Sequence, residues 1–330
     1  IGENFRSSRL PDINIVYDSY KNWLETQNGV YDRNSNKGWI FSLVGLYERR
    51  HPGNTCINSL KSNEIGTIKK PINNSKGNGG VMRVAPAGLL YYNNPKSAFN
   101  TGAACAAITH GHPSGYLAAG VFSSMLAYLV KGETIENAVD KSINILEKYE
   151  GHEEVKDSII LAKNLAKSNV SPKEAINKIG GGWVAEEAIA ISIYCSLKFP
   201  DSFENAVKAA VNHDGDSDST GAITGNIMGL YLGEKSIPKN WRDKIELKNE
   251  IRQLASDLFI APKNIQRIKE RYPYNNGRIP NWYDSGNKGP AVKLNQVKFL
   301  PQDIERMKKM TPEEKIRYKK YLMKKQKYIM

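Results

Sequence analysis

The sequence predicts an all-α protein, and three observations favour this fold class. Apolar residues recur every three or four positions along most of residues 1–258, which is typical of helices with one buried face. Gly and Pro stop signals separate these runs, as at Lys131-Gly132 and Pro200. We find neither a convincing strand ladder nor an internal repeat. We therefore expect one helical domain over 1–258, followed by a basic extension over 259–330.

The expected helices follow the periodic runs in order along the chain. They cover residues 17–26, 38–49, 95–109, 115–130, 134–148, 153–168, 172–178, 184–198, 202–212, 219–232 and 240–258. Stop signals follow many of them, at Lys131-Gly132, Glu150-Gly151, Gly180–Gly182, Pro200, Gly233 and Pro238.

Two helix starts and one apolar run can be interpreted individually. Pro113-Ser114 precedes one periodic run. Ser171-Pro172 precedes another and places an N-cap residue before Pro at the first helical position. The run Tyr116–Val130 is the most apolar of the chain, but it is shorter than the roughly 20 residues that span a membrane. We therefore expect it to form a buried helix.

An acidic turn at residues 212–225 is the most unusual segment. Asp214, Asp216 and Asp218 occupy alternate positions, and Ser219 follows them. Three carboxylates this close repel one another, so a folded protein needs a reason to keep them together. A hard cation such as Mg²⁺ or Ca²⁺ is the simplest reason, because these ions prefer carboxylate, hydroxyl and water oxygens.

Two known acidic motifs do not fit this turn. An EF-hand loop beginning at Asp214 would need Gly and Glu where the chain has Ser219 and Gly225. The Asp-x-Asp-x-Thr signature of haloacid-dehalogenase phosphatases needs a preceding strand, whereas Phe203–Val211 has helical spacing. A metal site between two helices remains, and the alternative is a solvated acidic turn that caps the next helix.

A glycine-rich loop lies within the segment Ser75–Pro86. Gly77, Asn78, Gly79 and Gly80 let the backbone approach a ligand closely and expose N–H groups to it. Arg83 follows shortly, and its guanidinium suits a phosphate or a carboxylate. A flexible turn before a helix is the alternative interpretation.

Two further segments have both a functional and a structural interpretation. His110 lies in Ile108–Pro113, where a small-residue helix ends and a donor to free carbonyls is favoured. It is therefore either a structural cap or a site residue. In Gly180–Ala188, Trp183 and the pair Glu186-Glu187 open an apolar helix. Acidic residues in a first helical turn suit the helix dipole, so we interpret these residues as mainly structural.

Together, four segments resemble the ADP-ribosylglycohydrolase family of the dinitrogenase-reductase-activating glycohydrolase type. Their order and spacing match the family's, and the similarity runs from about residue 17 to about residue 258. The segments are Ser75–Pro86, Ile108–Pro113, Gly180–Ala188 and Asp216–Gly221. The resemblance implies a compact multi-helix orthogonal bundle that binds two Mg²⁺ ions in a cleft.

The resemblance also implies site residues and a reaction. The metal ligands would be Asp216, Asp218 and Ser219, and the first two would also be catalytic. Contacts to ADP-ribose would come from Ser75, Gly77, Asn78, Gly79, Gly80, Arg83 and His110. We expect Mg²⁺-dependent hydrolysis of the bond between ADP-ribose and a modified side chain, with ADP-ribosyl-arginine as the expected substrate. The alternative is a non-catalytic module of the same fold that binds ADP-ribose or a partner.

One departure from the family pattern lies at the start of the chain. Members of the family carry an early Thr-Asp-Asp-Thr motif, with an acidic residue further upstream, and neither is present in this chain, which opens at Ile1. We expect an N-terminally truncated fragment that holds only part of a dinuclear site and has little activity alone. A degenerate family member is the alternative.

The basic charge is concentrated at the end of the chain. Residues 262–330 hold 18 Lys and Arg against 6 Asp and Glu, which gives +12 of the total net charge of +13. We expect 262–301 to be irregular and 302–328 to be a basic helix. This helix either contacts nucleic acid or an acidic surface, or is simply solvated.

Cysteine content bears on compartment and partners. Cys56, Cys105 and Cys195 are odd in number and have no paired spacing. This pattern favours a reducing compartment and argues against a zinc site. We expect a cytoplasmic monomer with no membrane contact, whose partner is an ADP-ribosylated protein or an ADP-ribose derivative.

Overall fold

The computed structural model describes residues 13–28 and 39–260. All of them belong to the first of two compact units, 1–286, and the second unit is 287–330. The predicted irregular segment 262–301 and the predicted helix 302–328 therefore lie outside the described residues. The domain boundary at 258 and the partners of the basic extension stay predictions.

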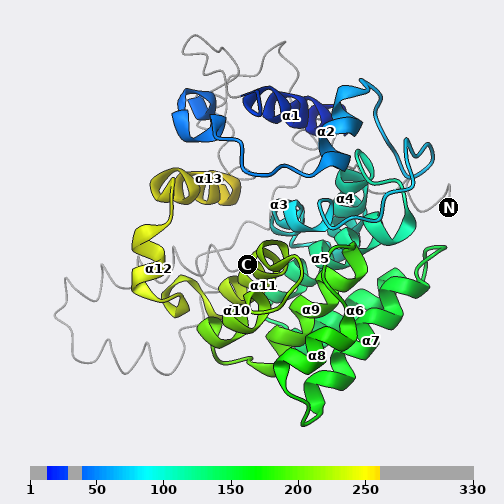
Figure 1. Ribbon diagram of the computed structural model, residues 1–330, viewed down its shortest axis with the longest axis vertical. Coiled ribbons are helices and arrows are strands. Elements are labelled where there is room, and N and C mark those ends of the chain that lie inside the picture. Colours follow the sequence, from blue (N-terminus) through cyan, green and yellow to red (C-terminus); the bar gives the residue numbers. More distant parts are fainter. Residues whose placement is uncertain (1–12, 29–38, 261–330) are drawn as a thin grey trace, which may run out of the picture. The chain divides into compact units, whose positions relative to one another are not determined.

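The described residues form helices joined by loops, and a long connection, 62–80, links α2 to η3 (Figure 1). The α-helices are α1 (Ile13–Thr26), α2 (Asn54–Lys61), α3 (Ala85–Leu90), α4 (Pro95–Ala107), α5 (Pro113–Val130), α6 (Ile135–Leu146), α7 (Glu153–Lys167), α8 (Pro172–Ile179), α9 (Ala185–Lys198), α10 (Phe203–Val211), α11 (Ser217–Leu232), α12 (Lys239–Lys244) and α13 (Lys248–Ile260). Four 3₁₀ turns accompany them, namely η1 (Trp39–Ser42), η2 (Val44–Tyr47), η3 (Val81–Arg83) and η4 (Glu234–Ser236). Over 13–28 and 39–260 there is no strand, which confirms the all-α prediction.

Helix α5 is the centre of the hydrophobic core. It packs against α3, α4, α6, α9 and α11 (Figure 1). In the described part of the chain it is the one helix whose length and composition suit a membrane span, yet 83% of that window is buried inside the fold. The prediction of a buried core helix at Tyr116–Val130 is therefore confirmed. Small residues let α4 and α5 approach closely, since a methyl group added at Gly102 would lie 2.1 Å from Ser123 Oγ.

A second, smaller cluster joins α1 and α2 to the end of α4. Tyr17 and Leu24 pack there with Ile57, Leu60 and Ile108. Ser59 Oγ on α2 also donates to the carbonyl of Thr109 at 3.1 Å. This packing fixes the C-terminal half of α2 beside the segment that carries His110.

Several predicted helix ends agree with the structure. Ser171 Oγ accepts from Glu174 N at 3.4 Å, and the Glu174 side chain accepts from Ser171 N, so α8 begins with a capping box followed by Pro172. Thr134 and Ser202 cap α6 and α10 in the same way with their hydroxyl oxygens.

Three predicted elements differ from the structure. The helix expected over 38–49 is instead a pair of 3₁₀ turns, because Leu43 between them is extended. The helix expected over 240–258 is broken into α12 and α13, where Leu247 has a φ of 52°. Helices α2 and α3 were not predicted. Both are short, and a Pro lies close to the start of each, Pro52 before α2 and Pro86 inside α3.

Candidate active site

The glycine-rich loop is bound to the start of α9 by backbone hydrogen bonds. Gly77 and Val184 form an isolated antiparallel bridge. Asn78 N donates to Trp183 O at 3.2 Å, and Ala185 N donates to Lys76 O at 2.8 Å. The loop is therefore fixed on a helix end, and the alternative of a flexible turn does not fit the structure.

Asn78 connects this loop to the acidic turn. Its buried side-chain Nδ2 donates to Gly182 O at 2.6 Å and to Asp216 Oδ2. Asp216 Oδ2 also accepts from Ser219 Oγ at 3.2 Å. Asp216 N in turn donates to Gly181 O at 2.8 Å. The glycine-rich loop and the acidic turn therefore meet, as predicted, and the cleft that they would face stays a prediction.

The carboxylate of Asp216 does not cap the helix that it precedes. Asp216 is the N-cap residue of α11, but its side chain makes no capping hydrogen bond. It turns instead toward Asn78. The alternative of a purely capping acidic turn is therefore not what the structure contains. Asp214, the third acid of the turn, is exposed.

Asp216 and Asp218 lie close enough to share a proton. Burial, together with the hydrogen bond to Asp218, raises the pKa of Asp216. The same hydrogen bond, helped by the backbone N–H groups of Asp218 and Ser219, lowers the pKa of Asp218. Two adjacent carboxylates repel when both are charged, so a proton or a cation between them stabilises the pair.

The donor set of the turn suits part of a hard-cation site. Asp216, Asp218 and Ser219 offer two carboxylates and a hydroxyl, which are ligands that Mg²⁺ accepts. Mg²⁺ commonly keeps several waters, so a few protein oxygens can hold one ion. Within 13–28 and 39–260 there is no cluster of three or more His, Cys, Asp or Glu side chains with metal-binding geometry. Both a single ion held by these three residues and the two ions implied by the resemblance stay predictions.

His110 lies directly against the glycine-rich loop. A methyl group added at Gly79 would be 3.3 Å from His110 Nε2, and one added at Gly77 would be 3.5 Å away. The two glycines leave room for the imidazole, which is only 2% exposed. Burial, reinforced by Arg83, lowers the pKa of His110 to about 3, so the ring is neutral near pH 7.

Arg83 does not take the role expected for it. Instead of facing a phosphate or a carboxylate, the partly buried guanidinium lies 4.4 Å from the ring centroid of Tyr20. It donates to Cys56 Sγ at 3.2 Å, to Cys105 O at 3.2 Å and to Thr109 Oγ1 at 2.7 Å. The turn η3 directs this side chain inward, where a carbonyl, a hydroxyl and an aromatic face accommodate its charge.

The remaining predicted contact residues divide into two groups. Ser75 Oγ lies 3.2 Å from Thr55 Oγ1 and accepts from Gly77 N at 3.3 Å, so it shapes the start of the loop. Gly80 serves close packing, since a methyl group there would lie 2.9 Å from Ala106 Cβ on α4. Ser75 and Gly77 are partly exposed, whereas Gly80 is buried.

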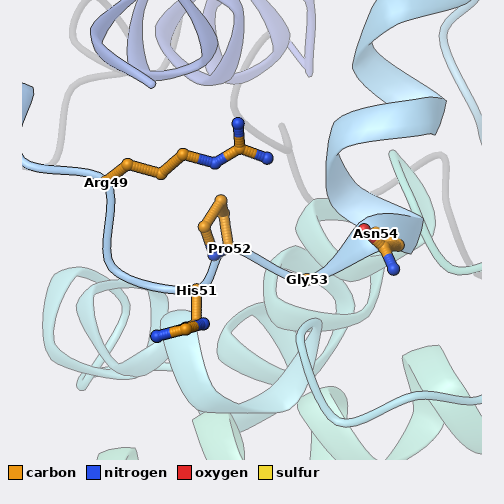
Figure 2. A pocket seen from close by; sticks show the side chains of 5 residues that line it. All are labelled: Arg49, His51, Pro52, Gly53 and Asn54. Carbon is orange, nitrogen blue, oxygen red and sulfur yellow. The ribbon is translucent and has the colours of Figure 1, made fainter. Parts of the chain in front are cut away.

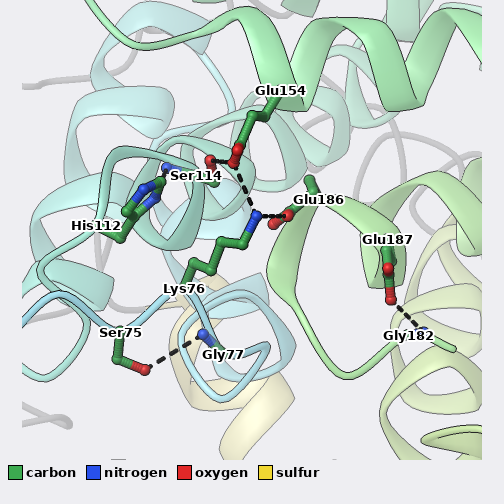
Figure 3. Close-up of polar contacts among 9 residues, drawn as sticks. All are labelled: Ser75, Lys76, Gly77, His112, Ser114, Glu154, Gly182, Glu186 and Glu187. Atoms are coloured by element: carbon green, nitrogen blue, oxygen red, sulfur yellow. Dashed lines mark hydrogen bonds and ion pairs between the residues drawn. The ribbon is translucent and has the colours of Figure 1, made fainter. Parts of the chain in front are cut away.

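A lysine clamp that the sequence did not reveal lies beside the loop (Figure 3). Lys76 Nζ is 2.6 Å from Glu186 Oε1 on α9 and 3.0 Å from Glu154 Oε2 on α7. Ser114 Oγ also donates to Glu154 Oε2 at 2.5 Å. Glu186 was interpreted only as a favourable charge at a helix start. Glu187 fits that interpretation better, because it accepts from Gly182 N at 2.9 Å.

A cavity of about 490 Å³ adjoins the start of α2 (Figure 2). Its lining consists of Arg49, His51, Pro52, Gly53 and Asn54. Thr55, which follows this lining directly, contacts Ser75, so the cavity lies near the glycine-rich loop. Trp183 is another neighbour of the loop, and its side chain is 64% exposed rather than part of the core.

The fold and this site together define the class of protein. The sequence profile of the ADP-ribosylglycohydrolase family matches residues 4–267. The chain therefore belongs to the ADP-ribosylglycohydrolase family, whose named members are hydrolases that act on glycosyl bonds.

Three characterised relatives show the range of the family that is similar to this chain. ADP-ribosylhydrolase ARH3 of Bos taurus is 27% identical over 254 residues, covering 69% of this chain and 68% of that protein. ADP-ribosylarginine hydrolase Tri1 of Serratia proteamaculans (strain 568) is 24% identical over 270 residues, covering 80% and 65%. ADP-ribosyl-[dinitrogen reductase] glycohydrolase of Rhodospirillum rubrum is 24% identical over 211 residues, covering 63% and 65%. The chain thus spans about two thirds of the length of these relatives.

A solved structure supports the fold. A chain of the "ADP-ribosylglycohydrolase-related protein complex" superposes with a TM-score of 0.51 at 22% sequence identity. The match covers 73% of this chain and 79% of that chain. It agrees with the multi-helix bundle expected from the sequence.

Proposed function

We propose that this protein hydrolyses the bond between ADP-ribose and a modified side chain, with ADP-ribosyl-arginine as the substrate. The observation that carries the proposal is the contact of Asn78 with Asp216, which unites the glycine-rich loop and the acidic turn. Family membership supplies the reaction class. The arginine linkage is supported by the name of the relative Tri1, an ADP-ribosylarginine hydrolase.

Each part of the site contributes a distinct interaction. The glycine-rich loop lets a ligand approach backbone N–H groups without side-chain obstruction. Asn78 orients the carboxylate of Asp216, and Ser219 supplies a hydroxyl to the same oxygen. Burial and the adjacent Asp218 raise the pKa of Asp216, which would favour its accepting a proton from an attacking water. When bound, a Mg²⁺ ion held by Asp216, Asp218 and Ser219 would polarise the ribose hydroxyls and lower the pKa of water.

The test is release of ADP-ribose from an ADP-ribosylated arginine peptide, with and without a chelator. In whichever form of the protein turns over, we expect chelator-sensitive activity that Asp216→Asn and Asp218→Asn reduce by at least about 100-fold, the usual effect of losing one positioned polar group. Asp214→Asn is the matched control, because Asp214 is an exposed acid of the same turn that is not among the proposed metal ligands. Turnover that is indifferent to both the chelator and Asp216→Asn would contradict the proposal.

Calorimetry with ADP-ribose separates catalysis from binding. Binding that depends on Asn78 without turnover of arginine, serine or free ADP-ribose derivatives would favour the alternative of a non-catalytic module. If the encoding sequence extends upstream of Ile1, the same assays on the extended protein show whether upstream residues complete the site. The absence of both binding and turnover in every form would contradict both functions.

A further inference from the structure

Thr109 lies between a cation and the imidazole of the site. Arg83 Nη2 donates to Thr109 Oγ1 at 2.7 Å. The same oxygen lies 2.8 Å from His110 Nδ1. An arginine side chain has donors only, so the first of these hydrogen bonds occupies a lone pair of the threonine oxygen. The single hydroxyl proton of Thr109 must therefore go to another acceptor.

His110 Nδ1 is the acceptor in place for that proton. Among the described residues, no other hydrogen bond from the Thr109 hydroxyl competes with it. A neutral imidazole that accepts at Nδ1 carries its proton on Nε2. Arg83, whose guanidinium cannot accept a hydrogen bond, thus sets the direction of the hydrogen bonds from Arg83 through Thr109 to His110. They leave the imidazole with an N–H at Nε2.

The Nε2 atom faces the ligand side of the glycine-rich loop. It lies 3.5 Å from where the Cβ of a side chain at Gly77 would begin, and 3.3 Å from the same position at Gly79. Across 13–28 and 39–260 it has no hydrogen-bond partner, although the ring is only 2% exposed. Nε2 is not among the fully buried side-chain atoms of the described residues that lack a partner, so its N–H is accessible to a ligand oxygen.

We propose that Arg83 and Thr109 are positioning residues that fix the Nε2–H tautomer of His110, so that this N–H donates to an oxygen of the ligand lying over Gly77 and Gly79. That the ligand is ADP-ribose rests on the proposed function; the tautomer does not. The oxygen belongs to a ribose hydroxyl or a phosphate, both of which accept. His110 makes this contact as a neutral donor and contributes no charge.

The surroundings of Arg83 suit this role. Stacking over Tyr20 at 4.4 Å and the hydrogen bond to Cys105 O at 3.2 Å hold the guanidinium in one orientation. Because Arg83 donates to Thr109 Oγ1 from a fixed orientation, the Thr109 hydroxyl cannot turn its proton toward Arg83. A lysine at this position would keep the charge but lose the planar fork that reaches both acceptors.

The direct test is the ¹⁵N NMR signature of the His110 ring. In ¹⁵N-histidine-labelled protein at neutral pH without ligand, we expect Nε2 to be protonated and Nδ1 to be unprotonated. His110→Gln removes these signals and assigns them among the five histidines. Thr109→Val, nearly isosteric but without a hydroxyl, should give a mixture of tautomers, and Thr109→Ser should restore the wild-type signature. A wild-type ring protonated on Nδ1, or a Val variant with an unchanged signature, would overturn the proposal.

The functional readout is ADP-ribose affinity by calorimetry. Thr109→Val should weaken binding about 3- to 10-fold, the effect of one poorly oriented neutral hydrogen bond. Thr109→Ser should recover most of this loss. If turnover is present, the substrate KM of each variant, compared with its kcat, gives a second readout. If the wild-type tautomer is as expected but ADP-ribose does not bind, the proposed function fails, and the role of Arg83 and Thr109 in fixing the tautomer stands. If ADP-ribose binds but the tautomer differs from the expected one, the role of Arg83 and Thr109 is contradicted and the proposed function is not.

Discussion

Asn78 uses both protons of its side-chain amide to join two segments that lie far apart in the sequence. One goes to Gly182 O and the other to Asp216 Oδ2. Asp216 Oδ2 also accepts from Ser219 Oγ. Asn78 therefore supports the geometry of the acidic turn as well as any contact with a ligand.

Replacement of Asn78 should lower stability and weaken the ligand site together. Asn78→Ala removes the side-chain donor of Gly182 O and leaves Asp216 Oδ2 with Ser219 alone, so we expect the free energy of unfolding to fall by about 1–3 kcal/mol. Asn78→Asp should be worse, because it adds a third carboxylate beside the pair. Urea denaturation measures the change. Asn226→Ala, at an exposed asparagine on α11, is the control and should change stability by less than about 0.5 kcal/mol. Equal effects of the two alanine variants would show that Asn78 has no special role.

The buried His110 should make stability depend on pH. Burial and Arg83 lower the pKa of His110 to about 3 in the folded protein, whereas an unfolded histidine titrates near 6.5. Above about pH 6.5 neither the folded nor the unfolded state binds the proton, so His110 causes no loss of stability there. Below it only the unfolded state binds the proton, so the free energy of unfolding decreases by up to about 1.4 kcal/mol per pH unit until about pH 3.

Denaturation curves between pH 4 and pH 7, a range of about three units around the histidine pKa, test this dependence. His110→Asn cannot titrate there and should reduce the slope by nearly one proton, whatever its absolute stability. A variant with the wild-type slope would mean that other groups cause the acid sensitivity.

At the scale of the elements, the lysine clamp joins the glycine-rich loop to α7 and α9 (Figure 3). Glu186 is 5% exposed, and its second carboxylate oxygen has no hydrogen-bond partner. Its charge therefore depends strongly on Lys76. The side chain of Lys76 is itself 34% exposed, so water moderates the strength of the pair.

Lys76→Met should destabilise the protein by roughly 1–3 kcal/mol, because it leaves the buried Glu186 carboxylate without its cation. The double variant Lys76→Met/Glu186→Gln should recover part of that loss, since it removes the uncompensated charge. Lys167→Met removes an exposed pair with Glu136 and should cost less than about 1 kcal/mol. Thermal unfolding of the three variants provides the comparison. A double variant less stable than Lys76→Met would contradict the explanation.

The sequence predicted those elements whose periodic run stands alone between stop signals. Helices α5 to α11 agree with their predicted ranges within a few residues, because Pro, Gly and N-cap residues bound them locally. The range 38–49 was wrong because an extended Leu43 interrupts it, and that conformation depends on surroundings rather than on periodicity. Helix α3 was missed because it is only six residues long and has Pro86 as its second residue.

The candidate site was predictable to the same limited extent. The convergence of Asn78 with Asp216 followed from the family resemblance and is present. The clamp at Lys76 and the hydroxyl of Thr109 depend on how distant segments meet, which local patterns do not encode. The inward direction of Arg83 is of the same kind, because the turn η3 and the stacking on Tyr20 decide it.

For the whole molecule, the closeness of α4 and α5 is the feature on which the core depends. A methyl group at Gly102 would lie 2.1 Å from Ser123 Oγ and 2.7 Å from Ala119 O on α5. These distances are far inside van der Waals contact, so the helices would have to separate.

Gly102→Ala should therefore reduce the free energy of unfolding by about 1–3 kcal/mol, as overpacking of a core usually does. Gly225→Ala is the matched helical control, because no atom lies within 4 Å of the added methyl group. It should be neutral or stabilise the protein by up to about 1 kcal/mol through helix propensity. Calorimetric melting of both variants gives the contrast. A Gly102→Ala protein as stable as the wild type would show that the helix pair is free to spread.

The contacts around Asn78 have a consequence for how the site can open. The loop 75–80 is bonded to the loop 180–184, that loop is bonded to the turn 215–219, and the turn is bonded back to Asn78. The three segments form a closed circuit, so the loss of one link leaves each segment attached through the other two. None of the three can open independently of the others. We therefore expect the backbone amides of all three segments to exchange their hydrogens together. Access for a ligand must then come from elements outside this circuit.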